Sequence, residues 1–243
     1  MARKFVIASG KGGVGKSSVA AGLAGALVHQ GKRVLLIDTD TGLRSLDIIL
    51  GVGEKAVYDW GDVLAGNCEL EKAFLRSDNG VCLLAAPATP SFKADIEDFR
   101  DMVKRCEEYF DCIFTDAPAG IDDGLRLAAC AADGGLVVST HDAVCVRSAS
   151  AAADTLEKYG VSESRLIINR FQKGKVGRGG LLNIDSVIDA TSVRLIGIVP
   201  EDAAVFMSAT GRRIPENSPA GRAFSRTARR LFGENVPLKL KKL

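Results

Sequence analysis

The sequence predicts an α/β fold in which a mostly parallel sheet carries helices on both faces. Two observations lead to this prediction, and a third concerns the number of domains. Strand-like and helix-like segments alternate along the chain, and the strand-like segments are continuously apolar, which is typical of parallel strands covered on both sides. No linker rich in Ser, Gly or Pro divides the 243 residues, so we expect a single domain over residues 1–243.

The N-terminal part begins the alternation. Lys4–Ala8 is a short β-rich run, and the Ala-rich segment Lys16–Gln30 after it predicts a helix that Gly31 ends. Two further apolar strands are expected at Val34–Asp38 and Val81–Ala85.

The rest of the chain continues in the same way. Over Asp95–Phe110, apolar side chains recur at the spacing of an amphipathic helix, and the apolar strand Cys112–Asp116 follows and ends in an acid. The Gly-rich and basic stretch Gln172–Gly180 is expected to be an exposed loop. The remaining segments predict three strands, Gly135–Ser139, Arg165–Asn169 and Arg194–Val199, and four helices, residues 122–132, 144–159, 202–210 and 219–232.

Composition excludes several classes of protein. Apolar residues make up 47% and charged residues 26% of the chain, a balance that excludes wholesale disorder. With 32 basic and 30 acidic residues, the net charge of +2 gives no indication of nucleic-acid binding. The most apolar stretch, Val19–Val28, is much shorter than the roughly 20 residues that a membrane-spanning helix needs. Six cysteines without CxxC spacing and only two histidines predict a reduced, cytoplasmic protein without a His-based metal site.

A glycine-rich loop between the first strand and the first helix is the most specific motif. Residues Gly10–Ser17 fit the phosphate-binding pattern GxxxxGK[ST], and they lie after a strand and before a helix, as this motif requires. Glycines allow backbone N–H groups to turn inward around phosphate oxygens, and the helix adds its positive N-terminal end. We expect the Lys16 ammonium to neutralise the β- and γ-phosphates and the Ser17 hydroxyl to bind Mg²⁺.

Three aspartates follow predicted strands at the same edge of the sheet. Asp116 ends its strand, as the metal-binding aspartate of phosphate-loop proteins does, and Asp38 and Asp40 lie at the end of the second strand. Ligands bind at the carboxyl edge of a parallel sheet, so all three are expected to face the phosphates. Helix caps or turn acids are the alternative interpretation of Asp38 and Asp40.

A second lysine, Lys11, makes the loop resemble the deviant Walker A sequence KGGVGK[ST] of the MinD/ParA ATPases. Ile37–Asp47 is similar to the IDxDxGLRNLD segment of the MinD branch, and Thr115–Gly120 is similar to its D[SC]PAG segment. The resemblance covers about residues 1–237 through four further segments in the same order: Val57–Asp59, Asn169–Arg170, Gly197–Asp202 and Leu231–Glu234. It implies a P-loop NTPase fold of the SIMIBI type.

The resemblance also implies a site for ATP and Mg²⁺ and an ATPase reaction that yields ADP and phosphate. Lys11, Lys16 and Asp40 would be catalytic, with Lys11 reaching the partner's phosphates in an ATP-dependent homodimer and Asp40 positioning the attacking water. The Mg²⁺ environment would be formed by Ser17, Asp38 and Asp116. ATP would be held by Gly10, Lys11, Gly12, Gly13, Val14, Gly15, Lys16, Ser17 and Ser18, and its adenine by Asn169, Arg170, Pro200 and Glu201.

The sequence departs from the MinD pattern at three places. Ser45 replaces a usual Asn, and Arg147–Ser150 replaces an acidic run in the partner-binding helix. The chain ends in a short basic and apolar tail, residues 236–243, where the family has a longer amphipathic segment. A MinC-like division inhibitor remains an expected partner, whereas the expectation of a MinE-like partner is weakened. The tail predicts no more than a weak peripheral contact with anionic lipid at the inner face of the cell membrane.

The leading hypothesis is an ATP-dependent switch that helps to place the division septum. A DNA-partitioning ATPase of the ParA type and a MinD-like regulator of flagellar number are the alternatives, and DNA is not an expected partner. The arginines that a DNA site would use, which also fit a solvated helix face, are Arg212, Arg213, Arg222, Arg226, Arg229 and Arg230. An iron–sulfur ATPase is disfavoured because the cysteine nearest to Asp116 on its C-terminal side, Cys130, is expected to be buried on a helix.

Overall fold

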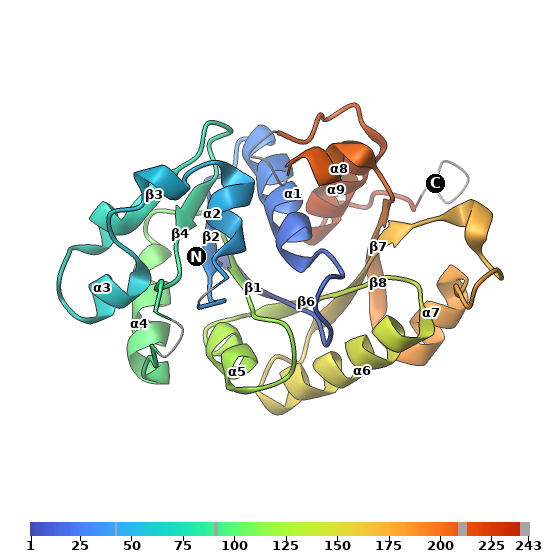
Figure 1. The fold of residues 1–243 in the computed structure, drawn as a ribbon, viewed down its shortest axis with the longest axis horizontal. Coiled ribbons are helices and arrows are strands. Elements are labelled where there is room, and N and C mark those ends of the chain that lie inside the picture. Colours follow the sequence, from blue (N-terminus) through green and yellow to red (C-terminus); the bar gives the residue numbers. More distant parts are fainter. Residues whose placement is uncertain (42, 90–91, 209–212, 239–243) are drawn as a thin grey trace.

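The computed structural model describes residues 1–41, 43–89, 92–208 and 213–238, and an eight-stranded sheet lies at its centre (Figure 1). The strands lie in the order β3-β4-β2-β5-β1-β6-β7-β8, and every neighbouring pair is parallel except β3 with β4. The predicted mostly parallel sheet is therefore confirmed. The strands are β1 (Arg3–Ala8), β2 (Val34–Asp38), β3 (Phe74–Arg76), β4 (Cys82–Leu84), β5 (Cys112–Asp116), β6 (Gly134–Ser139), β7 (Ser164–Phe171) and β8 (Arg194–Pro200).

Helices cover both faces of this sheet. Helices α1, α2 and α9 pack on one face, and α3 to α7 pack on the other (Figure 1). The helices are α1 (Lys16–His29), α2 (Ser45–Leu50), α3 (Trp60–Leu64), α4 (Ile96–Cys106), α5 (Asp123–Ala129), α6 (Ala143–Lys158), α7 (Ile184–Thr191), α8 (Ala203–Ser208) and α9 (Pro219–Leu231).

The strand β2 shows why the strands are apolar without interruption. Leu36 packs into the core under α1 and α9, whereas its neighbours Leu35 and Ile37 pack into the core under α3 and α4. Successive side chains of a strand point to opposite faces, so a sheet covered on both sides needs an apolar residue at every position. Burial of each aliphatic side chain stabilises the fold by about 1.5–3 kcal/mol.

Several elements differ from the sequence prediction. The predicted helix Asp95–Phe110 is shorter, because α4 ends at Cys106 and residues 107–109 form a turn. The strand β7 continues to Phe171, beyond its predicted end. The elements α2, α3, α7 and the antiparallel edge strand β3 were not predicted. Residues 209–210 of one predicted helix, Arg212 and residues 239–243 of the tail lie outside the described residues.

The predictions about cysteines and membrane segments are also tested by the fold. All six cysteines are free thiols, and four of them are buried. Cys130 is only partly buried and caps the C-terminus of α5, so its predicted place on the helix is off by one residue. Of the helices in the described ranges, none combines the length and apolar character that crossing a membrane requires.

Candidate functional site

The loop between β1 and α1 is held against two other elements. At Gly10, a Cβ atom would clash with the backbone carbonyl of Ser148 in α6. Gly15 has φ +88°, in the left-handed region, and a Cβ there would clash with the side-chain amide of Asn169 at the end of β7. Only glycine can adopt the left-handed backbone of Gly15 and also leave room for the Asn169 side chain. Packing therefore requires glycines in this loop, in addition to the need for backbone N–H groups that can turn towards phosphate.

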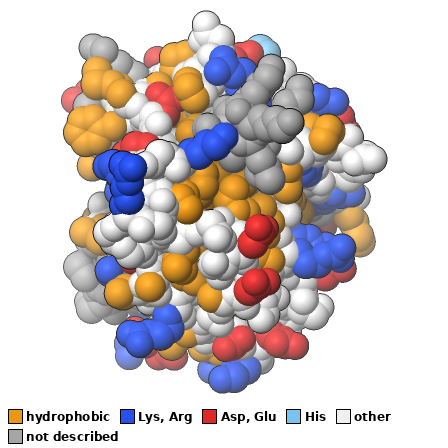
Figure 2. All heavy atoms as spheres, turned by 90° about the vertical axis from the view of Figure 1, so that its right-hand side faces the viewer, with side chains coloured by type: hydrophobic (Ala, Val, Ile, Leu, Met, Phe, Trp, Pro, Cys, Tyr) orange, Lys and Arg blue, Asp and Glu red, His pale blue; other side chains and the backbone are white. Residues whose placement is uncertain are grey.

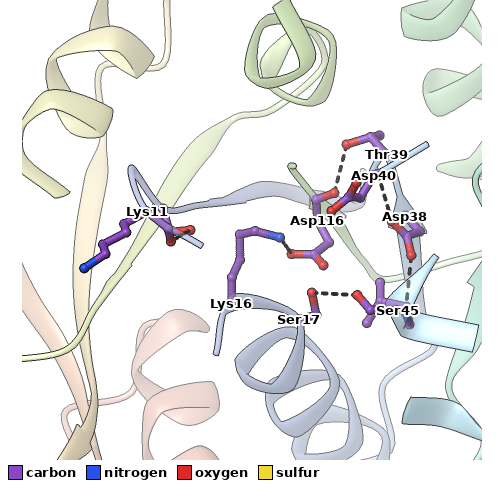
Figure 3. A network of polar contacts seen from close by, with 10 residues as sticks. Lys11, Lys16, Ser17, Asp38, Thr39, Asp40, Ser45 and Asp116 are labelled. Atoms are coloured by element: carbon purple, nitrogen blue, oxygen red, sulfur yellow. Dashed lines mark hydrogen bonds and ion pairs between the residues drawn. The ribbon is translucent and has the colours of Figure 1, made fainter. Parts of the chain in front are cut away.

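An ion pair in the interior lies directly beside this loop. Lys16, in the first turn of α1, places its Nζ atom 2.8 Å from Oδ1 of Asp116 at the end of β5 (Figure 3). The two side chains are only 8% and 0% exposed. Within the described part of the chain, the second carboxylate oxygen of Asp116, Oδ2, has no hydrogen-bond partner although it is buried. A buried acceptor without a donor is costly, which suggests that this oxygen has a partner outside the polypeptide.

Asp38 lies at the end of β2, the neighbour of β5, and is almost fully buried. Its carboxylate accepts hydrogen bonds from the backbone N–H groups of Asp40, at 2.9 Å, and of Leu46, at 3.3 Å. Burial and the nearby charge of Asp116 nevertheless raise the pKa of Asp38 to about 7. Partial burial also raises the pKa of Asp40, an effect that the charge of Lys16 opposes. The site therefore holds more negative charge than Lys16 alone can neutralise.

The oxygen atoms here are of the kind that Mg²⁺ prefers. Ser17 Oγ lies 3.2 Å from Ser45 Oγ, on the same side of Lys16 as the carboxylates (Figure 3). Carboxylates, a hydroxyl group and the unpartnered Asp116 Oδ2 suit a magnesium ion that completes its shell with phosphate oxygens and water. The described residues contain no cluster of three or more His, Cys, Asp or Glu that could hold a metal ion.

The structure brings most of the predicted site residues together, but Lys11 lies apart from them. Its side chain is exposed and points away from Lys16 and Asp116 (Figure 3). It lines a cavity of about 470 Å³ on the outer side of the loop, together with Asp142. Asp142 caps the N-terminus of α6. Partial burial acts to raise the pKa of Asp142. Hydrogen bonds from Thr140 and Cys145, together with the charge of Lys11, outweigh this effect and lower the pKa to about 2.

The residues predicted to hold adenine lie at the ends of β7 and β8. The Asn169 side chain donates a hydrogen bond from Nδ2 to the Val14 carbonyl at 2.7 Å, and the Arg170 guanidinium donates to the Gly13 carbonyl at 3.3 Å. Arg170 and Glu201 line the same cavity as Lys11, whereas Pro200 pairs with β7. The segment after β7 thus braces the phosphate loop, and its role towards adenine stays a prediction.

Sequence reasoning missed three buried side chains in or near the site. Thr39 donates a hydrogen bond to the backbone carbonyl of Asp116 at 2.8 Å, and the fully buried Trp60 donates from Nε1 to the carbonyl of Asp38 at 2.8 Å. The third is His141, which follows β6 at the same edge of the sheet. Thr39 and His141 each follow the carboxyl end of a parallel strand, and this position in the sequence could have indicated that they lie near the site.

Comparison with known proteins identifies the family of this chain. The family model of the CobQ/CobB/MinD/ParA nucleotide binding domain matches residues 5–214. The septum site-determining protein MinD of Synechocystis sp. is 36% identical over 245 residues, which cover 98% of this chain and 92% of that protein. MinD in a MinC:MinD cell division protein complex from Aquifex aeolicus aligns with a TM-score of 0.90 and 38% identity over 98% of both chains. MinD of Pyrococcus horikoshii, solved with Mg-ADP, aligns with a TM-score of 0.85 and 27% identity over 96% of this chain and 97% of that chain.

These matches confirm the predicted fold class and the resemblance described above, because they extend over nearly the whole chain and over nearly the whole of each relative. The chain belongs to the MinD/ParA family of P-loop ATPases and, within it, to the MinD septum site-determining proteins.

Proposed function

We propose that this protein is an ATP-hydrolysing switch that forms a homodimer with ATP and takes part in selecting the site of the division septum. In this proposal the chain acts as one ATPase domain. The observation that carries the proposal is the buried pair of Lys16 and Asp116 beneath the phosphate loop. A lysine held by a carboxylate at the N-terminus of a helix is ready to exchange that partner for phosphate oxygens.

ATP would lie in the loop Gly10–Ser18, with its β- and γ-phosphates at Lys16. The magnesium ion would be held by Ser17 and, through water, by Asp38 and Asp116, and when bound it would neutralise phosphate charge. The unpartnered Oδ2 of Asp116 supports this assignment. The Mg-ADP in the P. horikoshii relative supports the choice of nucleotide and ion. Asn169, Arg170, Pro200 and Glu201 are proposed to surround the adenine.

The homodimer proposal is supported by the surface around the site. Lys11 is exposed and directed away from the phosphates of its own chain, as a lysine that acts across an interface must be (Figure 3). Three exposed apolar side chains follow the carboxyl ends of the parallel strands β2, β5 and β6: Leu43 (75% exposed), Ile121 (43%) and Val144 (51%). Exposed apolar groups gathered at one edge of a sheet are typical of an association surface.

Hydrolysis would require a water molecule held for attack on the γ-phosphate. Asp40 is half-buried beside Asp38 and Lys16. Backbone N–H groups, one of them that of Asp40, occupy the Asp38 carboxylate, whereas no hydrogen bond within the described residues holds the Asp40 carboxylate. We therefore assign the water to Asp40. A carboxylate with this task acts in the transition state, so its loss slows turnover without loosening the phosphate cradle.

A MinC-like division inhibitor is the proposed protein partner, because the Aquifex relative was solved in a complex with MinC. DNA is not favoured. Arg229 pairs with Glu234, and Arg230 donates hydrogen bonds to the carbonyls of Ile196, Val236 and Pro237, so part of the predicted arginine cluster is used inside the fold. On the face that Figure 2 shows, basic side chains are scattered among apolar and acidic ones.

A weak peripheral contact with anionic membrane is proposed for the tail. Arg230 fixes the carbonyls of Val236 and Pro237, and the next residue, Leu238, is 40% exposed. The lysines and leucines that follow lie outside the described residues. One short tail gives marginal binding, whereas two tails on an ATP dimer gain affinity by avidity, by up to about 10²–10⁴-fold.

Nucleotide binding and phosphate release test the proposal. The purified protein is expected to bind Mg-ATP, to release phosphate and to change from monomer to dimer with ATP. Lys16→Ala is expected to lose nucleotide binding. Micromolar affinity for ATP in this variant would overturn the assignment of the phosphate loop.

A further inference from the structure

We infer that His141 is a positioning residue of the nucleotide site, because its two ring nitrogens fix the segment Asn169–Gln172 that braces the phosphate loop. This inference rests on the proposed function, since it concerns nucleotide binding at that loop.

His141 is 2% exposed, and it makes three hydrogen bonds to a distant part of the chain. Its Nδ1 atom lies 3.0 Å from the Leu182 carbonyl oxygen, and the backbone N–H of Gln172 lies 3.3 Å from Nε2. Its own backbone carbonyl accepts from the N–H of Leu182 at 2.8 Å. The ring also packs on Phe171, with 4.8 Å between ring centroids. The end of β6 is thereby tied to both ends of the segment 172–182.

These partners allow only one form of the imidazole ring. A carbonyl oxygen can only accept, so Nδ1 carries the proton, and a backbone N–H can only donate, so Nε2 is the acceptor. The ring that carries its proton on Nδ1 is therefore the form that holds both ends of the segment.

The segment that His141 holds is in direct contact with the phosphate loop. Asn169 and Arg170 lie three and two residues before Gln172, and they donate the hydrogen bonds to the Val14 and Gly13 carbonyls described above. Arg170 has φ +52°, a left-handed backbone that ordinary residues rarely adopt, so neighbouring contacts must keep it in place. Loss of the His141 anchor is expected to misplace Asn169 and Arg170 and with them the loop.

Other charged or titratable groups also face this region. They come from the phosphate loop, α6, the segment after β7 and the end of β8, and they are Lys11, Asp142, Cys145, Arg170, Lys175 and Glu201. The only other histidine, His29, lies at the C-terminal end of α1, where it pairs with Glu216 and is 61% exposed. A comparison of variants at the two histidines therefore isolates His141.

The test is the affinity for Mg-ADP, measured by isothermal titration calorimetry at pH 7.5 and well below the melting temperature. His141→Phe keeps an aromatic ring on Phe171 but loses both ring hydrogen bonds, and it is expected to bind ADP about tenfold more weakly. His141→Gln retains an acceptor for Gln172 and is expected to stay close to the wild type. Thr191→Val, which removes a buried hydrogen bond in α7, controls for lost stability and is expected to leave ADP affinity unchanged.

A third variant keeps the inference testable even if His141→Phe does not fold. His141→Asn keeps a donor on the side of the Leu182 carbonyl but has no acceptor that reaches the N–H of Gln172, so it is expected to bind ADP about tenfold more weakly than His141→Gln. His29→Gln is expected to follow the wild type. Equal ADP affinity of His141→Asn and His141→Gln, or wild-type affinity in a folded His141→Phe, would overturn the inference. If the wild type itself bound no ADP, the proposed function would fail as well.

Discussion

Breaking the buried pair of Lys16 and Asp116 should reduce both stability and nucleotide binding, and the two effects can be separated. Lys16→Ala leaves the fully buried Asp116 carboxylate without its cation, next to the second buried carboxylate, Asp38. Removing one partner of a buried ion pair costs about 3–5 kcal/mol. The charge on Asp38 adds to the repulsion, although its raised pKa lets it take up a proton and relieve part of that cost. We therefore expect a loss of about 3 kcal/mol.

The double variant Lys16→Ala/Asp116→Asn should recover most of this stability, because no unpaired carboxylate remains at position 116. A coupling energy of about 2–3 kcal/mol is expected from the double-mutant cycle, measured by urea unfolding followed by circular dichroism. Nucleotide binding should stay lost, since the lysine charge is still missing. Arg33→Ala is the matched control: its pair with Asp111 also spans 2.8 Å, but the Arg33 side chain is 60% exposed, so its loss should destabilise the fold much less than the loss of Lys16. Wild-type stability in Lys16→Ala would refute the reasoning.

Lys11→Ala is expected to bind ATP but to remain monomeric in light scattering, since its charge acts on the partner's phosphates; an ATP dimer of this variant would exclude that role. Asp40→Ala is expected to bind ATP and dimerise while releasing phosphate at least about 100-fold more slowly, and normal turnover would assign the water to another residue. Asp142→Ala should lose about 1 kcal/mol of stability at pH 7, because a carboxylate with a lowered pKa stabilises the fold at pH values above its ordinary pKa. This stabilisation is lost as the pH falls through the lowered pKa of about 2. An unfolding free-energy difference from the wild type that is as large at pH 2.5 as at pH 7 would contradict this. Deletion of residues 237–243 should abolish co-sedimentation with anionic vesicles in ATP and spare basal ATPase activity, whereas wild-type binding that is equal in ADP would contradict the tail proposal.

The sheet could be predicted from the sequence because its central strands contain continuous apolar runs and are separated by long helical segments. The strand β3 escaped prediction because it has three residues and pairs antiparallel at the edge, where no long apolar run is needed. Helix α2 has only six residues and starts after Arg44, whose left-handed backbone cannot be inferred from its residue type. Helix α3 carried a usable signal, the capping box of Asp59 and Asp62.

The candidate site was predictable where it depends on local motifs. The loop pattern and the acids at strand ends indicated Lys16, Asp38 and Asp116, which lie together in the fold. The side-chain partners of Asn169 and His141 were not predictable, because they are tertiary contacts. Asn169 is separated from Val14 by 155 positions in the sequence, and His141 is separated from Gln172 and Leu182 by 31 and 41 positions. No local sequence pattern indicates contacts between residues so far apart in the chain.

The mass of the Asp40→Ala variant in Mg-ATP and in Mg-ADP tests the central claim of a nucleotide-dependent switch most directly. Slow hydrolysis should hold this variant in its ATP state for the time that size-exclusion chromatography with light scattering needs. Twice the mass of one chain is predicted in ATP, and the mass of a single chain is predicted in ADP. The same mass with both nucleotides would contradict the account.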